Sequence, residues 1–166
     1  MSGTEIVARY SDAARPLVII GIGNDYRGDD AAGLEVARRI RDAGLGGVTV
    51  LEIGGDPTRL LHYWDHVPRV IVIDAVSSGS QPGTIRSFDA LNERLPNIFG
   101  PHLTTHGIGV VECVELARSL DQLPEHLTIY GIECRVFDVG TALSPEVARA
   151  VEETATRIVS REAHPR

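Results

Sequence analysis

The stretch that decides the fold runs from Leu17 to Gly33 and reads Leu-Val-Ile-Ile-Gly-Ile-Gly-Asn-Asp-Tyr-Arg-Gly-Asp-Asp-Ala-Ala-Gly. It begins with an apolar run rich in β-branched side chains, which is typical of a buried strand. A glycine-rich turn follows and ends in two adjacent carboxylates, Asp29 and Asp30. Turns of this kind usually hold phosphate with backbone N–H groups. Two carboxylates at the mouth of the turn repel phosphate, and they suit a metal ion or proton transfer instead.

The known nucleotide-binding fingerprints do not fit this turn. Gly21 and Gly23 begin a dinucleotide pattern, but Tyr26 stands at the position of its third glycine. The same turn also has P-loop spacing, but Asp29 and Asp30 replace the lysine and the hydroxyl residue of that motif. Capping of the next helix would explain one of the two aspartates, for which we take Asp29, but not both. The pair therefore predicts a functional site.

Apolar runs and amphipathic helical patterns alternate along the rest of the chain. We expect strands near residues 17–22, 48–53, 69–74, 84–88 and 127–134, and helices near residues 31–43, 58–65, 107–120 and 145–161. Ser144 is the expected N-cap of the last helix, with Pro145 at its first position. The alternation predicts an α/β sandwich with a largely parallel sheet. We expect one domain over residues 1–166, with residues 1–16 as a flexible N-terminal extension.

Three features fall where strands end, and ligands bind beyond the carboxyl ends of the strands in such sheets. Asp29 and Asp30 follow the first strand, Gly54 and Gly55 follow the second, and Asp74 ends the third. A carboxylate is costly to bury at such a place unless it is paired, hydrogen-bonded or bound to metal. Asp74 is therefore either a functional group or a cap for the loop that follows it.

A histidine could complete this group of acids. His106 precedes a predicted helix, and His102 lies four residues before it. Two carboxylates and one imidazole form a three-ligand metal site with open positions, which is the composition of a catalytic or substrate-binding site. The alternative is an ordinary histidine that is exposed or hydrogen-bonded.

The other candidate groups receive structural interpretations. His62 and His66 resemble the metalloprotease pattern of two histidines on one helix, but Tyr63 stands where the catalytic glutamate is needed. We expect them on an exposed helix face. Cys113 and Cys134 form no CxxC pair, so we expect two reduced, partly buried thiols. No GxSxG motif supports a serine nucleophile.

Composition excludes several classes of partner. The 166 residues carry a net charge of −7, so there is no basic surface for nucleic acid or anionic membranes. No apolar run approaches the ~20 residues needed to span a bilayer. The N-terminus lacks the apolar core of a signal peptide. We expect a cytoplasmic protein that binds neither nucleic acid nor membrane.

Taken in order, the motifs resemble those of the hydrogenase maturation proteases, which trim the C-terminus of the large subunit of nickel–iron hydrogenases. The resemblance covers the chain from Leu17 to the last helix. It rests on three motifs: residues 21–24 with 29–33, residues 70–75 with 82–84, and residues 106–109. It implies a three-layer α/β/α sandwich around a twisted, mostly parallel five-stranded sheet with helices on both faces.

The resemblance also implies roles for single residues. By position, Asp30, Asp74 and His106 match the metal-binding residues of the family, with Asp30 and Asp74 as the catalytic carboxylates. The Gly-Ile-Gly that follows His106 favours it over His102. Gly54 and Gly55 match a substrate-binding segment, although the family tends to show Asp-Gly-Gly-Thr there. Asp29 is expected to support the site.

The activity that the resemblance implies is an endopeptidase that cuts the hydrogenase large-subunit precursor after nickel insertion. Its paired carboxylates would place it in the aspartic-type class. The nickel is carried by the substrate, and zinc or cadmium can replace it in vitro. We expect the enzyme to be a monomer. Two alternatives stay open: a non-catalytic nickel-binding chaperone for hydrogenase assembly, and an α/β hydrolase that processes nucleosides or nucleotides.

Overall fold

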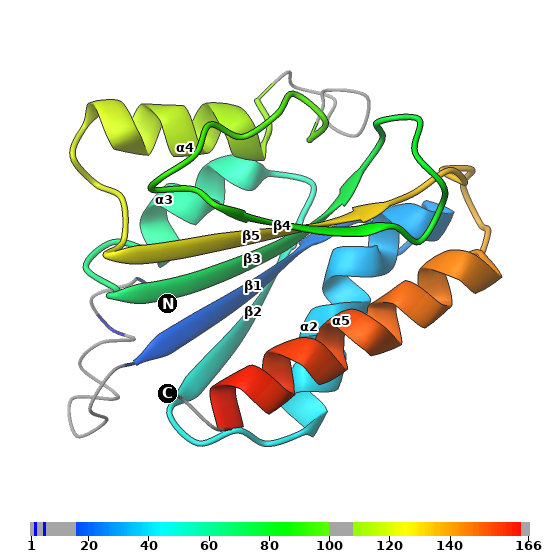
Figure 1. Ribbon diagram of the computed structural model, residues 1–166, viewed down its shortest axis with the longest axis horizontal. Helices are drawn as coiled ribbons and strands as arrows, with labels where there is room; N and C mark the ends of the chain where they lie inside the picture. The colour runs from blue at the N-terminus through cyan, green and yellow to red at the C-terminus, as the bar shows by residue number, and fades with distance from the viewer. Residues whose placement is uncertain (1, 3–4, 6–15, 100–107, 164–166) are drawn as a thin grey trace.

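The described part of the chain forms one twisted sheet with helices on both faces (Figure 1). The computed structural model describes residues 2, 5, 16–99 and 108–163. The predicted N-terminal extension therefore lies almost wholly outside the described residues. The strands are β1 (Leu17–Gly23), β2 (Val48–Gly54), β3 (Arg69–Val76), β4 (Ile85–Asp89) and β5 (His126–Glu133). The helices are the 3-10 turns η1 (Gly28–Ala31) and η2 (Pro57–Arg59), with α2 (Ala32–Asp42), α3 (Leu60–Tyr63), α4 (Val110–Ser119) and α5 (Pro145–Ala163).

The sheet has the order β2-β1-β3-β5-β4. Neighbours among β2, β1, β3 and β5 pair in parallel, and β4 pairs antiparallel with β5 at one edge. The central position of β3 follows from its nearly continuous apolar sequence, which suits a strand covered on both faces. The prediction of a mostly parallel five-stranded sheet in a three-layer sandwich is confirmed.

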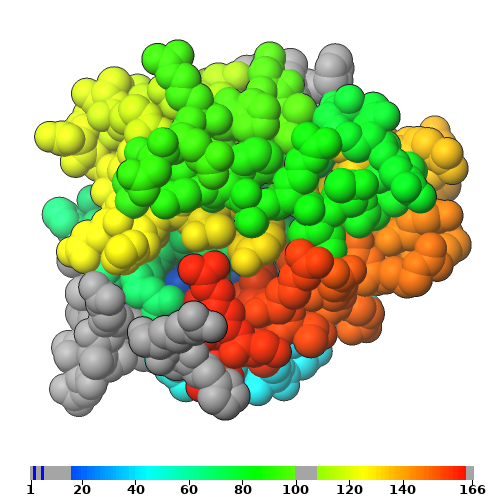
Figure 2. Space-filling view, viewed as in Figure 1, coloured from blue at the N-terminus to red at the C-terminus, as the bar shows by residue number. Residues whose placement is uncertain are grey.

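The two faces of the sheet carry separate hydrophobic layers. Strand residues such as Val18 and Val72 pack in the layer beneath α3 and α4, whereas Ile19 and Ile73 pack beneath α2 and α5. In the space-filling view, α5 (orange to red) and the green segment that contains β4 cover much of the front of the molecule (Figure 2).

The glycines of the opening motif allow α2 to lie directly on the sheet. A Cβ atom on Gly21 would lie 2.2 Å from the carbonyl oxygen of Gly33, and one on Gly33 would lie 2.4 Å from that of Ile73. Neither position has room for a side chain, so these glycines serve close helix–strand packing. The glycine pattern that resembled a phosphate loop is thus accounted for by packing.

Some predicted boundaries shift. The helix expected near residues 58–65 consists of η2 and one turn of α3, and it ends at Tyr63. Asp56 begins η2 by accepting a hydrogen bond from the backbone N–H of Thr58 (3.1 Å), with Pro57 at the first position as predicted. The helix expected from residue 107 begins at Val110, while residue 107 lies outside the described residues. None of the described helices has both the length and the apolar character needed to cross a membrane.

Candidate active site

The turn after β1 is where both adjacent aspartates lie. It closes through a hydrogen bond from the backbone N–H of Asn24 to the carbonyl oxygen of Asp30 (3.2 Å). Both aspartates lie in η1, which forms the last part of this turn and leads directly into α2. No side chain caps η1 or α2 by a hydrogen bond, so the prediction that Asp29 caps the helix is wrong. Its carboxylate is engaged elsewhere.

Asp29 is fully buried and holds a distant loop. Its carboxylate accepts hydrogen bonds from the backbone N–H groups of Arg135 (3.1 Å), Val136 (3.0 Å) and Ser144 (2.6 Å), and from the hydroxyl of Ser144 (3.1 Å). Ser144 stands at the predicted N-cap position, since its carbonyl accepts the first hydrogen bond of α5 from Ala148. Asp29 therefore fixes the segment between β5 and α5 against the opening turn. Its predicted supporting role in the site stays a prediction.

Asp30 differs from its neighbour in having no such partners. Its side chain forms no hydrogen bond or ion pair within the described part of the chain, although only 4% of the residue is exposed. Burial raises the pKa of its carboxyl to about 6, against a smaller opposing effect of the positive charge of Arg27. A desolvated carboxylate without a hydrogen-bond donor favours the approach of a proton or a cation.

Asp74 lies on β3, on the sheet face that α3 and α4 cover, and is half-buried. One of its oxygens accepts a hydrogen bond from the backbone N–H of Ala75 (2.8 Å), so the loop-capping interpretation is realised in part. Burial raises the pKa of Asp74 to about 8, and the negative charge of nearby Asp30 contributes to the increase. The structure thus brings Asp30 of η1 and Asp74 of β3 close enough to interact electrostatically.

The wall beside Asp74 is shaped by a glycine and an aromatic ring. Gly131 of β5 pairs with Asp74, and a Cβ atom there would lie 2.8 Å from the side chain of Val76 and 3.2 Å from the ring of Phe99. The absence of a side chain at Gly131 leaves room for that ring. Phe99 is the last described residue before residues 100–107, and its carbonyl oxygen would lie 3.0 Å from a Cβ atom on Gly109. The two described ends that flank residues 100–107 therefore meet.

His106 and its competitor His102 lie outside the described residues. Within the part of the chain that the structure describes, no three His, Cys, Asp or Glu side chains are grouped so that they could hold a metal ion. Asp30 and Asp74 could supply two oxygen ligands, and a full ligand set would then need a further group. Carboxylate oxygens with an imidazole or a thiolate would suit a divalent transition metal.

Gly54 and Gly55 lie at the same edge of the sheet. Gly54 ends β2 in register with Gly23, and both Gly54 and Gly55 are exposed. Gly55 has φ +72° with open space where a Cβ atom would be. Their predicted contact with substrate is compatible with this position and stays a prediction.

Glu133 is an anchoring residue that the sequence reasoning missed. It ends β5, is buried, and accepts hydrogen bonds from the backbone N–H of Ser78 (2.8 Å), the hydroxyl of Ser78 (2.7 Å) and the backbone N–H of Gly79 (3.0 Å). It thereby holds the loop that follows β3. The signal was present in the sequence, because Glu133, like Asp74, is a carboxylate near the carboxyl end of an apolar strand.

The expected exposure of the two histidines and the expected reduced, buried thiols are confirmed, but the expectation that both histidines lie on one helix is wrong. His62 and His66 are exposed, and α3 ends at Tyr63, so the two histidines do not share a helix face. Cys113 and Cys134 are buried free thiols. Burial raises the pKa of Cys113 to about 11 and raises that of Cys134 further, so both thiols stay protonated at neutral pH.

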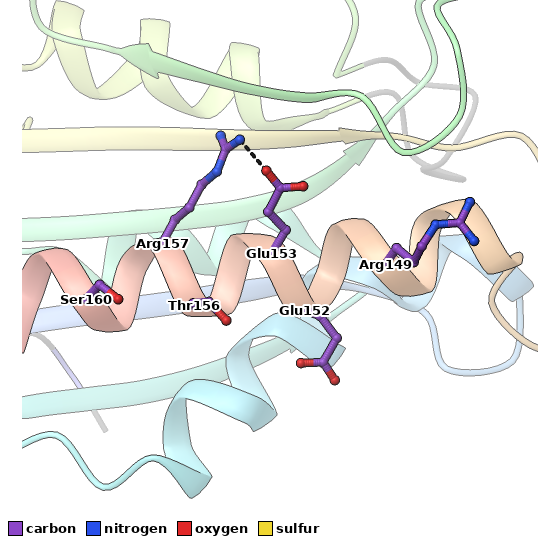
Figure 3. Close-up of a pocket in the computed structure, with 6 residues that line it drawn as sticks. All are labelled: Arg149, Glu152, Glu153, Thr156, Arg157 and Ser160. Atoms are coloured by element: carbon purple, nitrogen blue, oxygen red, sulfur yellow. Dashed lines mark hydrogen bonds and ion pairs between the residues drawn. The ribbon is translucent and has the colours of Figure 1, made fainter.

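A surface hollow of about 670 Å³ lies elsewhere, along α5 (Figure 3). Its lining consists of Arg149, Glu152, Glu153, Thr156, Arg157 and Ser160, with an ion pair between Arg157 and Glu153. These are ordinary solvent-facing helix residues, and the hollow contains none of the predicted site residues. We therefore place the candidate site at Asp30 and Asp74.

Comparison with known proteins decides the family. A family model described as hydrogenase maturation protease matches residues 33–161. The chain belongs to the hydrogenase maturation protease family. Among curated relatives, the hydrogenase expression/formation protein HupD of Bradyrhizobium diazoefficiens is 28% identical over 137 residues, which cover 79% of this chain and 69% of HupD. HupD of Rhizobium leguminosarum bv. viciae is 28% identical over 152 residues, covering 86% and 73%.

Solved structures agree on the fold of this maturation protease. The hydrogenase maturating endopeptidase HybD from E. coli superposes with a TM-score of 0.75 at 22% identity, covering 89% of this chain and 93% of HybD. The nickel–iron hydrogenase maturation protease HybD from Thermococcus kodakarensis gives 0.63 at 26% identity, covering 90% and 99%. The predicted family, fold and endopeptidase class are confirmed.

Proposed function

We propose that this protease removes the C-terminal peptide of a nickel–iron hydrogenase large-subunit precursor, in the cytoplasm and as a monomer. The observation that carries the proposal is the pair of carboxylates Asp30 and Asp74, which lie together at the carboxyl edge of the sheet with raised pKa values. Two desolvated carboxylates that repel each other create a site that a cation stabilises.

The cation in this proposal is nickel that the precursor already carries. Asp30, Asp74 and His106 would complete its coordination and thereby position the adjoining peptide for cleavage. Oxygen and nitrogen ligands suit nickel, and zinc or cadmium accept similar ligands, so either could take its place in vitro. Because the metal arrives with the substrate, a precursor without nickel would be held poorly and would escape cleavage.

For hydrolysis we assign the catalytic role to Asp30 and Asp74. A carboxylate oxygen that is not bound to the metal can accept a proton from the attacking water as a general base. Gly54 and Gly55, exposed at the end of β2, would accept the peptide backbone because no side chain obstructs it.

The test mixes the purified protein with precursor prepared with and without nickel. Mass spectrometry of the precursor should show loss of its C-terminal peptide only in the nickel-loaded sample. Asp30→Asn, Asp74→Asn and His106→Ala should each reduce the cleavage rate at least ~100-fold, as expected for groups that act on the reacting atoms. Asp42→Asn changes an exposed carboxylate at the end of α2 and should stay within twofold of wild type.

Two results would contradict the proposal. Stable binding of nickel-loaded precursor without mass loss, under conditions where another maturation protease cuts, would indicate an assembly chaperone. Normal cleavage by Asp74→Asn would show that the reaction takes place elsewhere on the molecule.

A further inference from the structure

Two loops that are far apart in the sequence are joined beside the candidate site. The first, residues 24–30, follows β1, and the second, residues 135–144, links β5 to α5. We call them the paired loops. Besides the four hydrogen bonds to the Asp29 carboxylate, the backbone N–H of Asp29 donates to the carbonyl of Val136 (2.7 Å). The Arg27 guanidinium donates to the carbonyl of Phe137 (3.3 Å), and the N–H of Gly140 donates to the carbonyl of Tyr26 (2.9 Å).

The contact between the paired loops is close as well as hydrogen-bonded. A Cβ atom on Gly28 would lie 2.4 Å from the hydroxyl of Thr141 and 2.7 Å from the carbonyl of Val136, and Gly28 has φ +53°. Only glycine fits this conformation and this spacing. The base of the paired loops is therefore fixed backbone, with the fully buried carboxylate of Asp29 at its centre.

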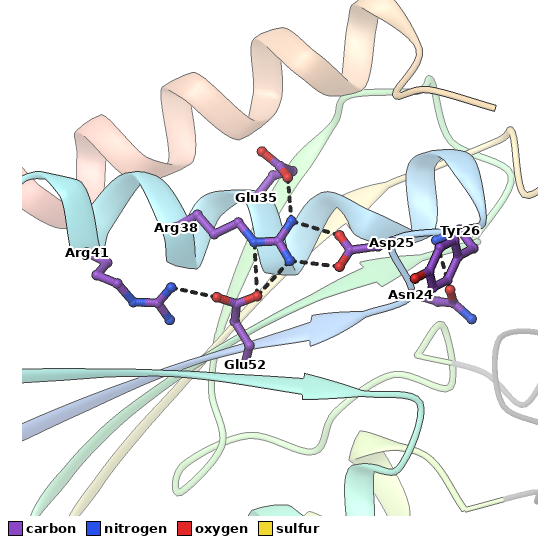
Figure 4. A network of polar contacts seen from close by, with 7 residues as sticks. All are labelled: Asn24, Asp25, Tyr26, Glu35, Arg38, Arg41 and Glu52. Atoms are coloured by element: carbon purple, nitrogen blue, oxygen red, sulfur yellow. Dashed lines mark hydrogen bonds and ion pairs between the residues drawn. The ribbon is translucent and has the colours of Figure 1, made fainter. Parts of the chain in front are cut away.

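The opening turn is held from its other side too. Arg38 of α2 forms a two-pronged ion pair with Asp25 (2.7 and 2.8 Å), and it also bonds Glu35 and Glu52 (Figure 4). The side chain of Asn24 accepts a hydrogen bond from the N–H of Tyr26 (2.9 Å). Tyr26 thus projects from a turn whose backbone is restrained on both sides.

This rigid base displays two large apolar side chains to solvent. Tyr26 is 76% exposed and Val139 is 79% exposed, and the Gly140-to-Tyr26 hydrogen bond makes them neighbours across the paired loops. Among the described residues, the other exposed large apolar side chains lie on or next to α4 and none exceeds 54%. Burying an aromatic ring on a preorganised backbone gains free energy at little cost in conformational entropy.

We propose that Tyr26 and Val139 anchor the folded body of the hydrogenase precursor, beside the site that receives its metal and C-terminal peptide. The proposal rests on the proposed function. The occupant follows from continuity: Tyr26 stands four residues before Asp30 in one closed turn, so a partner that reaches Asp30 and Asp74 passes over the paired loops. The partner should present an apolar patch near its metal-bearing region, because the two anchors are large apolar side chains that are mostly exposed.

The test measures cleavage kinetics with nickel-loaded precursor. Tyr26→Ala and Val139→Ala should each raise KM roughly 10-fold and leave kcat within twofold, since they remove docking contacts remote from the reacting bond. Tyr26→Phe keeps the ring and should bind like wild type. Leu120→Ala is the matched control, because it truncates an exposed apolar side chain just after α4 and should change KM by less than twofold.

The outcomes separate this proposal from the proposed function. If wild type cleaves the precursor and the Tyr26→Ala/Val139→Ala double variant has an unchanged KM, the docking surface is wrong and the proposed function stands. If wild type does not cleave, direct binding of the precursor decides: a ~10-fold or greater loss of affinity in the double variant supports the docking surface, and equal affinity overturns it. Urea unfolding of the double variant verifies that its fold is intact.

Discussion

Asp29 and Asp30 are the same residue type at adjacent positions, yet the paired loops and the candidate site use them in opposite ways. Asp29 is fully buried and accepts four hydrogen bonds from Arg135, Val136 and Ser144. Asp30 is nearly as buried, but its side chain has no hydrogen bond within the described residues. A buried carboxylate whose oxygens accept hydrogen bonds stabilises the fold. A buried carboxylate without hydrogen-bond donors lowers stability and is available for chemistry. Burial alone therefore does not distinguish structural from functional acids.

The substitution with the largest expected effect is Asp29→Ala, which tests whether Asp29 stabilises the fold. The substitution leaves three backbone N–H groups of the paired loops without acceptors, and breaking a buried charged network typically costs about 3–5 kcal/mol. Urea unfolding should show that loss in the free energy of unfolding. Asp29→Asn should lose less, because one oxygen remains to accept hydrogen bonds.

Asp42→Ala provides the matched control, since its carboxylate is exposed and its loss should cost less than about 0.5 kcal/mol. A cost below about 1 kcal/mol for Asp29→Ala would mean that water or a shift of the loop replaces the carboxylate. The assignment of Asp29 to folding would then fail.

The reciprocal variants are Asp30→Asn and Asp74→Asn. They remove carboxyl groups whose ionisation is disfavoured by burial, so the free energy of unfolding should stay equal or increase. Cleavage should fall at least ~100-fold, a loss of about 2.7 kcal/mol in transition-state stabilisation. Urea unfolding and the precursor assay on the same preparations measure both effects. A large loss of stability in either variant would show that its carboxylate, like that of Asp29, mainly stabilises the fold.

The pH dependence of stability sharpens the comparison further. An unfolded aspartate titrates near ~3.9, whereas the pKa of Asp30 is raised to about 6 and that of Asp74 to about 8 in the folded chain. Between these values the folded state holds protons that the unfolded state has released. The contribution of these groups to stability is therefore complete below pH ~4 and is lost as the pH rises toward 8.

Asp74→Asn should remove most of the loss of stability that occurs between the pKa of Asp30, about 6, and that of Asp74, about 8. Measured without added metal, its advantage over wild type in the free energy of unfolding should grow by about 1–3 kcal/mol from pH 5 to pH 8. Asp42→Asn should run parallel to wild type over the same range. Parallel curves for Asp74→Asn and wild type would show that Asp74 titrates normally in the folded protein.

The fold was largely predictable because its signals are local. The near-continuous apolar sequence of β3 predicts a strand covered on both faces, and β3 is central in the sheet. The antiparallel pairing of β4 at the edge carries no such signal, since neighbouring residues do not specify the direction of a partner strand. The short α3 was overestimated because its amphipathic pattern continues into residues that the structure places beyond the helix.

The candidate site was predictable only where an acidic residue lies in an apolar strand or a glycine-rich turn. Asp74 in an apolar strand and a pair of acids in a glycine-rich turn are both costly arrangements, and costly arrangements mark function. The role of Asp29 could not be found in this way, because its partners lie more than 100 residues further along the chain. Glu133 satisfied the same criterion as Asp74 but proved to be an anchor, and only its three hydrogen bonds distinguish it.

The smallest expected effect tests whether histidines outside the candidate site matter. His62 and His66 are exposed, and His66 adopts φ +61° after the end of α3, so the two imidazoles cannot act as a pair on one helix face. The double variant His62→Ala/His66→Ala should therefore change the free energy of unfolding by less than about 1 kcal/mol and the cleavage rate by less than twofold. A loss of cleavage as large as that expected for Asp74→Asn would move the metal-binding site to the surface beside α3. The comparison between Asp29 and Asp30 would then concern folding alone, because Asp30 would no longer belong to the reaction.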